Sequence, residues 1–268
     1  MPADAFTALL LGDVFGKPGR QALAKQLPSI LEQTGARFTI ANAENASGGI
    51  GLTPEVADEL LGLGIDVLTS GNHIWKHKEI RPYLDGESRL LRPANYPSGS
   101  PGRGARVFSG PESIPIGVVN LQGLLFMDAL ACPFRTADDL LHALHPRTRI
   151  ILVDFHAEAT SEKRAMGHYL DGRVTAIVGT HTHIPTADAE ILPGGTGYLS
   201  DLGMCGPTDS VIGVRKESAI QRFTTRLPHP FQVARKGLQI QGALVRIDPD
   251  SGSCLDISQR SWPVDADD

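Results

Sequence analysis

The sequence is poor in cysteine and has no long apolar run near its start. Cys132, Cys205 and Cys254 show no paired spacing among the 268 residues, which excludes a disulfide framework and indicates reduced thiols. The apolar run at residues 8–11 is far too short for a signal peptide or a membrane span. We therefore expect a cytoplasmic protein that is not attached to a membrane.

An excess of basic residues is also absent. Lys and Arg total 25 against 30 for Asp and Glu, which gives a net charge of −5. This balance argues against a protein whose main role is to bind nucleic acid. Binding of a small phosphate ester needs only a local positive site. Hydrophobic residues make up 41% of the chain and charged residues 21%, which is typical of globular proteins and excludes disorder or a coiled coil. We expect one domain over residues 1–268.

Short apolar runs alternate with amphipathic stretches along most of the chain. Apolar spacing predicts helices at 18–33 and 53–61, where Pro18 suits a first turn and Thr53 an N-cap. This alternation predicts an α/β fold with a largely parallel sheet, and the tail at 231–264 predicts an antiparallel hairpin region. The strands are expected at residues 6–11, 37–41, 66–69, 114–121, 149–155, 174–179 and 196–199, with a long loop over 85–104.

Nearly every strand predicted in the first two-thirds of the chain ends in unusual polar residues. Because the carboxyl ends of parallel strands meet at one edge of a sheet, we expect these side chains to converge. Carboxylate, amide and imidazole groups together suit divalent ions such as Fe, Mn or Zn. So large a set favours a two-metal site with a carboxylate between ions about 3.5–4 Å apart. The candidates are Asp13, Glu44, Asn45, Asn72, His73, His156, His181 and His183.

Each of these residues alone also has an ordinary structural interpretation. An Asp after a strand commonly belongs to a turn, and a single His is commonly a surface side chain. His-x-His also opens metal-dependent amidohydrolase barrels, but there it typically lies on the first strand. Here His181 and His183 lie two-thirds along the chain. The repetition of such residues at five strand ends favours the metal site.

Six motifs follow one another along the chain. They are Gly-Asp-Val-Phe-Gly-Lys-Pro-Gly-Arg (12–20), Asn-Ala-Glu-Asn-Ala-Ser-Gly-Gly (42–49), Gly-Asn-His-Ile-Trp (71–75), Arg-Pro-Ala-Asn-Tyr-Pro (92–97), Gly-Thr-His-Thr-His (179–183) and Asp-Leu-Gly-Met-Cys-Gly (201–206). The order of the motifs resembles that in the calcineurin-like metallophosphoesterases, and their exact residues are similar to those of the YmdB-like branch. The resemblance implies a four-layer α/β/β/α sandwich of the metallophosphoesterase type. It also implies activity on 2′,3′-cyclic nucleotides such as 2′,3′-cyclic AMP.

Two positions depart from the pattern of the wider superfamily. The usual first motif is Asp-x-His, but here Phe15 fills the third position and cannot bind a metal. Glu44 replaces the usual bridging Asp, and the side-chain oxygen of Asn45 offers a substitute for the missing His. The resemblance implies two divalent ions per subunit, with Fe or Mn favoured and Zn also fitting. One ion is expected on Asp13, Glu44, Asn45 and His183, and the other on Glu44, Asn72, His156 and His181.

The expected chemistry follows from this pair of ions. Two cations bind phosphate oxygens and lower the pKa of a shared water, so that hydroxide attacks phosphorus. His73 directly follows the ligand Asn72 and is expected to protonate the leaving oxygen as general acid, with a structural or surface role as the alternative. Arg92, Asn95 and Tyr96 lie in the long loop and are weaker candidates for substrate contact. A purely structural loop suits these three residues equally well.

We therefore expect a di-metal phosphodiesterase with a small phosphodiester substrate. One alternative is a phosphomonoesterase or nucleotidase on the same metal core. Another is a regulatory protein that senses a nucleotide through the metal site. No stable nucleic-acid partner and no membrane are expected, and the sequence leaves open whether the chain forms a homo-oligomer.

Overall fold

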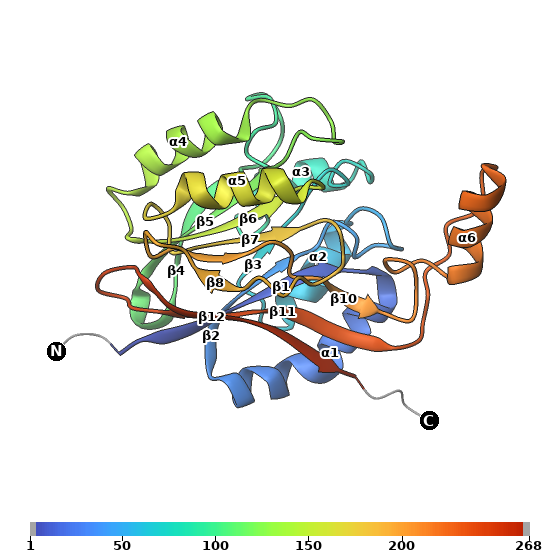
Figure 1. Cartoon of the computed structure of the whole chain (residues 1–268), viewed down its shortest axis with the longest axis horizontal. Helices are drawn as coiled ribbons and strands as arrows, with labels where there is room; N and C mark the ends of the chain where they lie inside the picture. Colours follow the sequence, from blue (N-terminus) through green and yellow to red (C-terminus); the bar gives the residue numbers. More distant parts are fainter. Residues whose placement is uncertain (1–3, 265–268) are drawn as a thin grey trace.

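Two six-stranded sheets lie face to face in the computed structural model, which describes residues 4–264 (Figure 1). The first sheet contains, in spatial order, β12 (Cys254–Pro263), β11 (Leu238–Ile247), β10 (Met204–Pro207), β1 (Phe6–Val14), β2 (Ala36–Asn42) and β3 (Val67–Thr69). The second contains β4 (Ala105–Ser109), β5 (Pro115–Gln122), β6 (Ile150–His156), β7 (Ala176–Thr180), β9 (Gly197–Leu199) and β8 (Glu190–Ile191). The helices are α1 (Gly16–Thr34), α2 (Pro54–Gly62), α3 (Ile80–Gly86), α4 (Pro133–Leu144), α5 (Thr160–Leu170) and α6 (Lys216–Thr225).

Apolar cores hold the layers together. Strand β1 places Leu9 and Leu11 in a core with α1 and α2, and Ala8 and Leu10 in the core between the two sheets. The two faces differ because successive side chains of a strand point in opposite directions. A third core joins the outer face of the second sheet to α4 and α5. The layers are therefore helix, sheet, sheet, helix, and the expected α/β/β/α sandwich is confirmed (Figure 1).

The predicted helix boundaries are close to those observed. Helix α1 buries Leu23 and Leu27 on one face and ends before Gly35, whose φ of 63° is the left-handed conformation that glycine adopts most easily. Helix α2 has the expected N-cap, because the Thr53 hydroxyl accepts a hydrogen bond from the Val56 N–H at 3.4 Å. These local signals in the sequence mark the end of α1 and the start of α2.

Strand direction also follows the prediction for the central strands. The first sheet has parallel pairs among β10, β1, β2 and β3, and the second has them among β5, β6, β7 and β9. Strands β11 and β12 form the expected antiparallel pair. The prediction omitted the edge strands β4 and β8, strand β10 and helices α3 to α6. Most of these elements are short or lie at the surface, so that their apolar pattern is weak.

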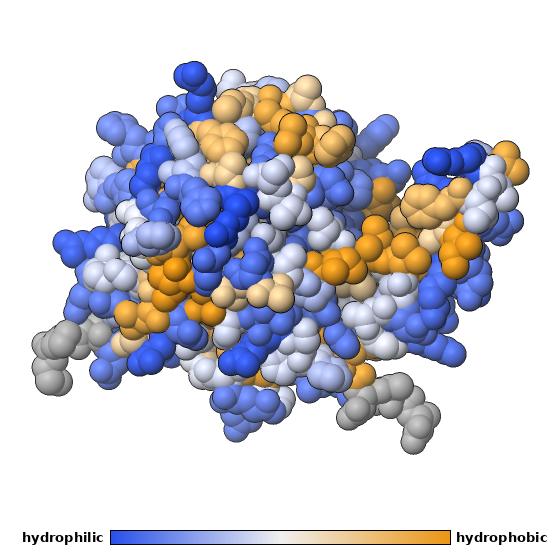
Figure 2. All heavy atoms as spheres, viewed as in Figure 1, coloured by the Kyte–Doolittle hydropathy of each residue, from blue (hydrophilic) through white to orange (hydrophobic). Residues whose placement is uncertain are grey.

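The segment that carries α6 lies apart from the layers and extends away from the body (Figure 1). Large apolar side chains on this segment are exposed, among them Ile212, Ile220 and Phe223, and Figure 2 shows an apolar surface along it. Within residues 4–264, no helix combines the length and apolar character that crossing a bilayer requires.

Candidate metal centre

Strands of both sheets end at a common edge. Asp13 lies beside Asn42 in the pairing of β1 with β2, and His156 lies beside Thr180 in the pairing of β6 with β7. The Asn42 amide joins the two sheets by donating to Asp154 Oδ2 at 3.0 Å. Polar side chains that are far apart in the sequence therefore meet at this edge.

His156 lies at the centre of one group of these side chains. Its Nε2 is 3.1 Å from Asn72 Oδ1 and 3.2 Å from Glu44 Oε1. The same nitrogen is 3.0 Å from Nδ1 of His181. Glu44, His156 and His181 each offer a ligand atom within 4.8 Å of the others. Nitrogen and oxygen atoms with lone pairs thus converge on a small volume, which is the arrangement that a divalent cation requires.

The protonation state of His156 follows from its other ring nitrogen. Thr180 Oγ1 donates to Asp154 Oδ1 at 2.7 Å, so the same hydroxyl accepts from His156 Nδ1 at 2.9 Å. A neutral His156 then carries its proton on Nδ1 and directs the lone pair of Nε2 toward Asn72 and Glu44. The chain Asp154–Thr180–His156 therefore holds the imidazole in an orientation that suits metal binding.

Asp13 and His183 form a second group beside the first. His183 Nδ1 donates to the Ile212 carbonyl at 2.9 Å, which leaves its Nε2 facing Asp13 Oδ1 at 3.6 Å. Asp13 Oδ2 accepts from the His181 N–H at 3.1 Å. Asp13 Oδ1, by contrast, is buried and has no hydrogen-bond partner within residues 4–264. A buried carboxylate oxygen without a donor is costly, and a cation at this point would remove that cost.

Glu44 lies between the two groups and is completely buried. Its Oε1 is near His156 Nε2 and accepts from Asn45 Nδ2 at 3.1 Å. The same Asn45 nitrogen is 3.1 Å from His183 Nε2. An asparagine side chain binds a metal through its oxygen and not through its nitrogen. Asn45 would therefore bind an ion with its amide turned over. Glu44 is therefore placed to contact an ion in either group.

The electrostatics of the buried groups favour a cation. Burial opposes ionisation of Glu44, but the rings of His156 and His73 hold its pKa well below the usual range. Burial also opposes the charging of His156, but the carboxylates of Glu44 and Asp13 raise its pKa to about 9. Burial and the neighbouring His156 lower the pKa of His181 to about 3. The carboxylates are thus anionic and His181 is neutral, and a bound metal would replace the proton of His156.

The two histidines of the His-x-His turn have unusual backbone conformations. The φ angle is 98° at His181 and 64° at His183, in a region that costs about 1–3 kcal/mol for residues other than glycine. Asp201 Oδ2 holds the residue between them, accepting from Thr182 Oγ1 at 2.8 Å and from Thr182 N at 3.2 Å. Hydrogen bonds from Thr182 to Asp201 therefore stabilise the strained turn at its central residue.

A buried lysine completes this support. Lys163 Nζ donates to Asp201 Oδ2 at 2.6 Å and to the Thr180 carbonyl at 2.7 Å. Both Lys163 and Asp201 are buried. The ammonium group thus joins the end of β7 to the carboxylate that holds the turn, and this places His181 and His183 relative to the sheet.

Gly71 allows the two sheets to approach each other at the centre. A Cβ atom at this position would lie 2.2 Å from His156 Nε2 and 2.5 Å from Glu44 Oε2. Any other residue here would displace both side chains, which explains the glycine directly before Asn72.

The chain is similar to known proteins over almost its whole length. The profile of the family described as YmdB-like protein matches residues 9–259. The chain belongs to the YmdB-like family. It is 44% identical to the 2′,3′-cyclic-nucleotide 2′-phosphodiesterase of Bacillus subtilis over 94% of this chain and 95% of that protein.

Two solved structures are similar to the chain over almost their whole lengths. A hypothetical protein from Thermus thermophilus is 40% identical, with a TM-score of 0.90 over 96% of this chain and 99% of that one. A protein from Mycoplasma pneumoniae, described as a novel phosphatase, is 33% identical, with a TM-score of 0.91 over 98% of this chain and 95% of that one. The fold of this YmdB-like chain is therefore that of its relatives.

Phe15 takes the place of the histidine that the wider superfamily carries. In this YmdB-like chain its ring meets His183 edge-on, with the ring centroids 5.4 Å apart. Phe15 is buried and contacts the backbone near Gly49 and Gly213. The Asp13 group is therefore bordered by an apolar ring at the position where the Asp-x-His motif would supply a nitrogen ligand.

His73 differs from the other histidines of the centre because its side chain is 34% exposed. Its backbone N–H donates to Glu44 Oε2 at 2.9 Å, and its Nδ1 lies 2.9 Å from Asn45 Oδ1. No hydrogen bond to Nε2 occurs within residues 4–264. This YmdB-like centre therefore includes one imidazole nitrogen, beside the candidate ligands, that is open to solvent.

The three weaker candidates of the long loop have mainly structural contacts. The buried Arg92 donates to the carbonyls of Pro93 at 2.8 Å and Pro101 at 3.2 Å. Asn95 is also buried and bonds to both the N–H and the carbonyl of Gln122. Tyr96 is half-buried, and its hydroxyl donates to Gln122 Oε1 at 3.3 Å. The arrangement favours the structural interpretation for Arg92 and Asn95.

Two residues that support the centre, Asp154 and Lys163, were not among the site candidates drawn from the sequence. Asp154 stands within the apolar run Ile-Ile-Leu-Val-Asp-Phe-His, and a carboxylate in a buried strand is a usable signal. Lys163 lies within Ser-Glu-Lys-Arg, which is typical of an exposed helical surface. Only the fold reveals that this lysine is buried against Asp201.

Proposed function

We propose that the chain is a two-metal phosphodiesterase that hydrolyses small 2′,3′-cyclic nucleotides such as 2′,3′-cyclic AMP. The observation that carries this proposal is the buried oxygen of Asp13, which lacks a donor beside the lone-pair cluster of Glu44, His156 and His181. The name of the Bacillus subtilis relative supplies the substrate class.

The proposed ligands are divided as the sequence predicts. Glu44 would contact both ions because it lies between the two groups. Asp13, Asn45 and His183 would hold one ion, and Asn72, His156 and His181 the other. Fe or Mn is the proposed metal and Zn also fits, because mixed nitrogen and oxygen ligands suit all three. We place the enzyme in the cytoplasm.

The bound ions and His73 have separate roles in the proposed hydrolysis. When bound, two divalent cations supply Lewis acidity to the phosphate oxygens and make hydroxide available at neutral pH. Attack on phosphorus breaks one bond between phosphorus and a ribose oxygen. His73 donates its proton to that leaving oxygen, a role for which imidazole is suited near neutral pH. With its amide turned over to bind an ion, Asn45 would donate from Nδ2 to His73 Nδ1, which leaves the ring proton on Nε2, and the His73 N–H contact to Glu44 holds the residue in place.

Elemental analysis combined with a substrate panel tests this function on protein purified without chelator. The panel contains 2′,3′-cyclic AMP, 3′,5′-cyclic AMP and 3′-AMP. We expect bound transition metal and the fastest turnover on the 2′,3′-cyclic substrate. Faster release of phosphate from 3′-AMP would instead assign a phosphomonoesterase. Nucleotide binding without turnover in the metal-replete protein would assign a sensor.

A further inference from the structure

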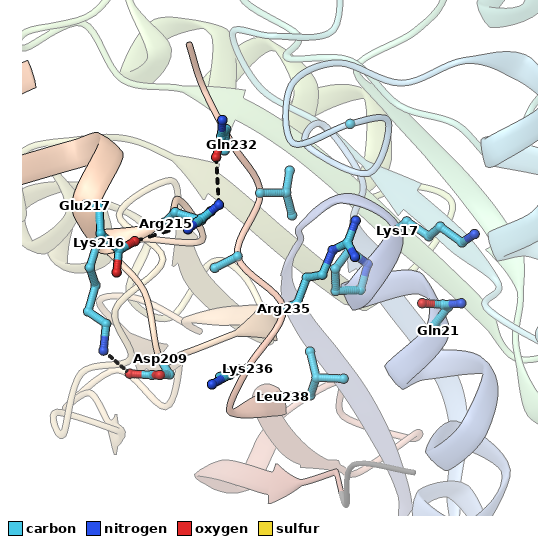
Figure 3. A pocket seen from close by; sticks show the side chains of 14 residues that line it. Lys17, Gln21, Asp209, Arg215, Lys216, Glu217, Gln232, Arg235, Lys236 and Leu238 are labelled. Atoms are coloured by element: carbon cyan, nitrogen blue, oxygen red, sulfur yellow. Dashed lines mark hydrogen bonds and ion pairs between the residues drawn. The ribbon is translucent and has the colours of Figure 1, made fainter. Parts of the chain in front are cut away.

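A large pocket lies outside the metal centre, between the first turn of α1 and the segment that carries α6. Its volume is about 1130 Å³. Pro18 and Lys17 contribute one side, while Val233 and Leu238 belong to the opposite chain segment. Figure 3 shows Lys17 and Gln21 on α1 across from the irregular segment with Arg235 and Lys236. The pocket thus combines apolar walls with cationic side chains.

The charge in this pocket is unusual for an acidic chain. Five cationic residues and two acidic residues line it, although the whole chain has a net charge of −5. Asp209 pairs with Lys216, and Glu217 lies 3.6 Å from Arg215. Both acidic groups are therefore engaged with the two cations at the base of α6.

Three cations remain without such partners. The side chains of Lys17, Arg235 and Lys236 make no hydrogen bond or ion pair within residues 4–264, and Lys236 joins Lys216 in lowering the pKa of Asp209 through its charge alone. They come from two segments that are distant in the sequence but face the same pocket. Like charges held together around a concave surface repel one another, and an anion placed among them removes this repulsion.

The pocket shares a wall with the metal centre. The segment that lines the pocket also provides the Ile212 carbonyl, which accepts from His183 Nδ1 at 2.9 Å. Val233 and the Phe15 ring both lie near Gly49, and Phe15 meets His183 edge-on. Phe15 therefore separates the pocket from the proposed ligands of one ion.

We propose that this pocket binds a phosphate-rich nucleotide. The base would lie on the apolar walls formed by Pro18, Val233 and Leu238, and the phosphates would contact Lys17, Arg235 and Lys236. Two sources share this chemistry. One is a short ribonucleotide chain whose last residue carries the cyclic phosphate at the metal centre, in which case the inference rests on the proposed function. The other is a free nucleoside polyphosphate.

Binding of two probes to the full-length, metal-replete protein tests the proposal. The probes are a triribonucleotide with a 3′-phosphate and ATP without added magnesium, each followed by calorimetry over a range of salt concentrations. The test variant is Arg235→Gln with Lys236→Gln. The matched control is Arg106→Gln with Arg246→Gln, because these exposed residues on β4 and β11 do not line the pocket.

We expect at least one probe to bind the wild-type protein and the control equally, and to bind the test variant at least tenfold more weakly. Each lost phosphate contact reduces the slope of log K against log salt by about 0.7 for a single strand, so the slope should fall by about 1.4. An unchanged affinity in the test variant, or no binding of either probe to the wild type, would overturn the proposal.

Turnover separates the two sources and keeps the proposal distinct from the catalytic function. A ribonucleotide chain in the pocket predicts that kcat/KM falls in the test variant for a trinucleotide ending in a 2′,3′-cyclic phosphate, but not for 2′,3′-cyclic AMP. A free nucleotide predicts weaker ATP binding with both turnover rates unchanged. If 2′,3′-cyclic AMP is not hydrolysed at all, the proposed function fails while the ATP measurement still decides the pocket.

Discussion

The two groups of side chains at the candidate metal centre are supported in different ways. His156 is backed by Thr180, which is itself backed by the buried Asp154. His183 is backed by a single carbonyl and the edge of Phe15. Asp13, its neighbour, keeps one oxygen without a donor. We infer that the His156 group holds its shape unaided, whereas the Asp13 group depends more on a bound ion.

This contrast has a consequence for metal binding. Partners behind a ligand fix its orientation and typically change metal affinity 10- to 100-fold. Stepwise removal of metal by a chelator should therefore empty the Asp13 group first.

Glu44→Gln should have the largest effect, because the Glu44 carboxylate lies between both groups. An amide keeps the shape but removes the negative charge that either ion would share. We expect loss of both ions and of activity, measured by elemental analysis and by turnover of 2′,3′-cyclic AMP. Glu59→Gln is the control, because Glu59 is exposed and pairs with Arg20 on the surface. A Glu44→Gln protein that keeps its full metal content would refute the bridging role.

Lys163→Met should disturb the turn that serves both groups. The change leaves Asp201 as a buried charge without its cation, which typically costs about 3–5 kcal/mol of unfolding free energy. Denaturant unfolding of the metal-free protein measures this loss, and metal titration measures the weaker affinity. Lys78→Met, at an exposed position, should change neither quantity.

A double variant separates positioning from stability at the same site. Lys163→Met with Asp201→Asn removes both charges, so much of the lost stability should return. The turn that carries His181 and His183 would still lack the ammonium contact to Thr180, so the metal affinity should stay low. If both quantities recover together, the ion pair supports the fold without positioning the ligands.

The sequence identifies the proposed ligands more readily than the residues behind them, and the reason is physical. Asp13, Asn72 and His156 stand at strand ends, and the parallel α/β arrangement brings such ends together whatever the loops between them. Lys163 acquires its role only when α5 packs against β7. Nothing local distinguishes a buried lysine in a charged helical segment from an exposed one.

The same reasoning explains the parts of the fold that were missed. Buried strands such as β6 are continuous apolar runs and are visible in the sequence. Helix α6 buries only Ala219, so it lacks the apolar stripe that identifies a helix packed on a core. The pocket beside it depends on the spatial approach of Lys17 to Arg235, which no sequence pattern encodes.

Asp13→Asn should sharpen the contrast between the groups. The substitution removes the charge that one ion requires but leaves the Asp154–Thr180–His156 chain intact. We expect the variant to lose about half of its metal content, with activity near background because hydrolysis needs both ions. Asn72→Ala is the converse change and should spare the ion at Asp13. Elemental analysis that finds all metal absent from Asp13→Asn would contradict the independence of the two groups.

Thr180→Val should weaken the better-supported group without removing a ligand. Valine has a similar shape but cannot accept from His156 Nδ1, so the ring loses the contact that directs Nε2 to the metal. A 10- to 100-fold loss of metal affinity is expected in competition titrations, while Thr225→Val on the exposed α6 should have no effect. An unchanged affinity would mean that packing alone orients His156.

His73→Asn should leave the metal content unchanged and alter only the chemistry. A missing general acid typically costs about 10²- to 10⁴-fold in rate, but only where the leaving oxygen needs a proton. Ribose oxygen is a poor leaving group, whereas p-nitrophenolate departs readily without protonation. The variant should therefore lose far more activity on 2′,3′-cyclic AMP than on bis(p-nitrophenyl) phosphate. Equal losses on both substrates would show that His73 acts in another way, for example by holding Asn45, its partner at 2.9 Å.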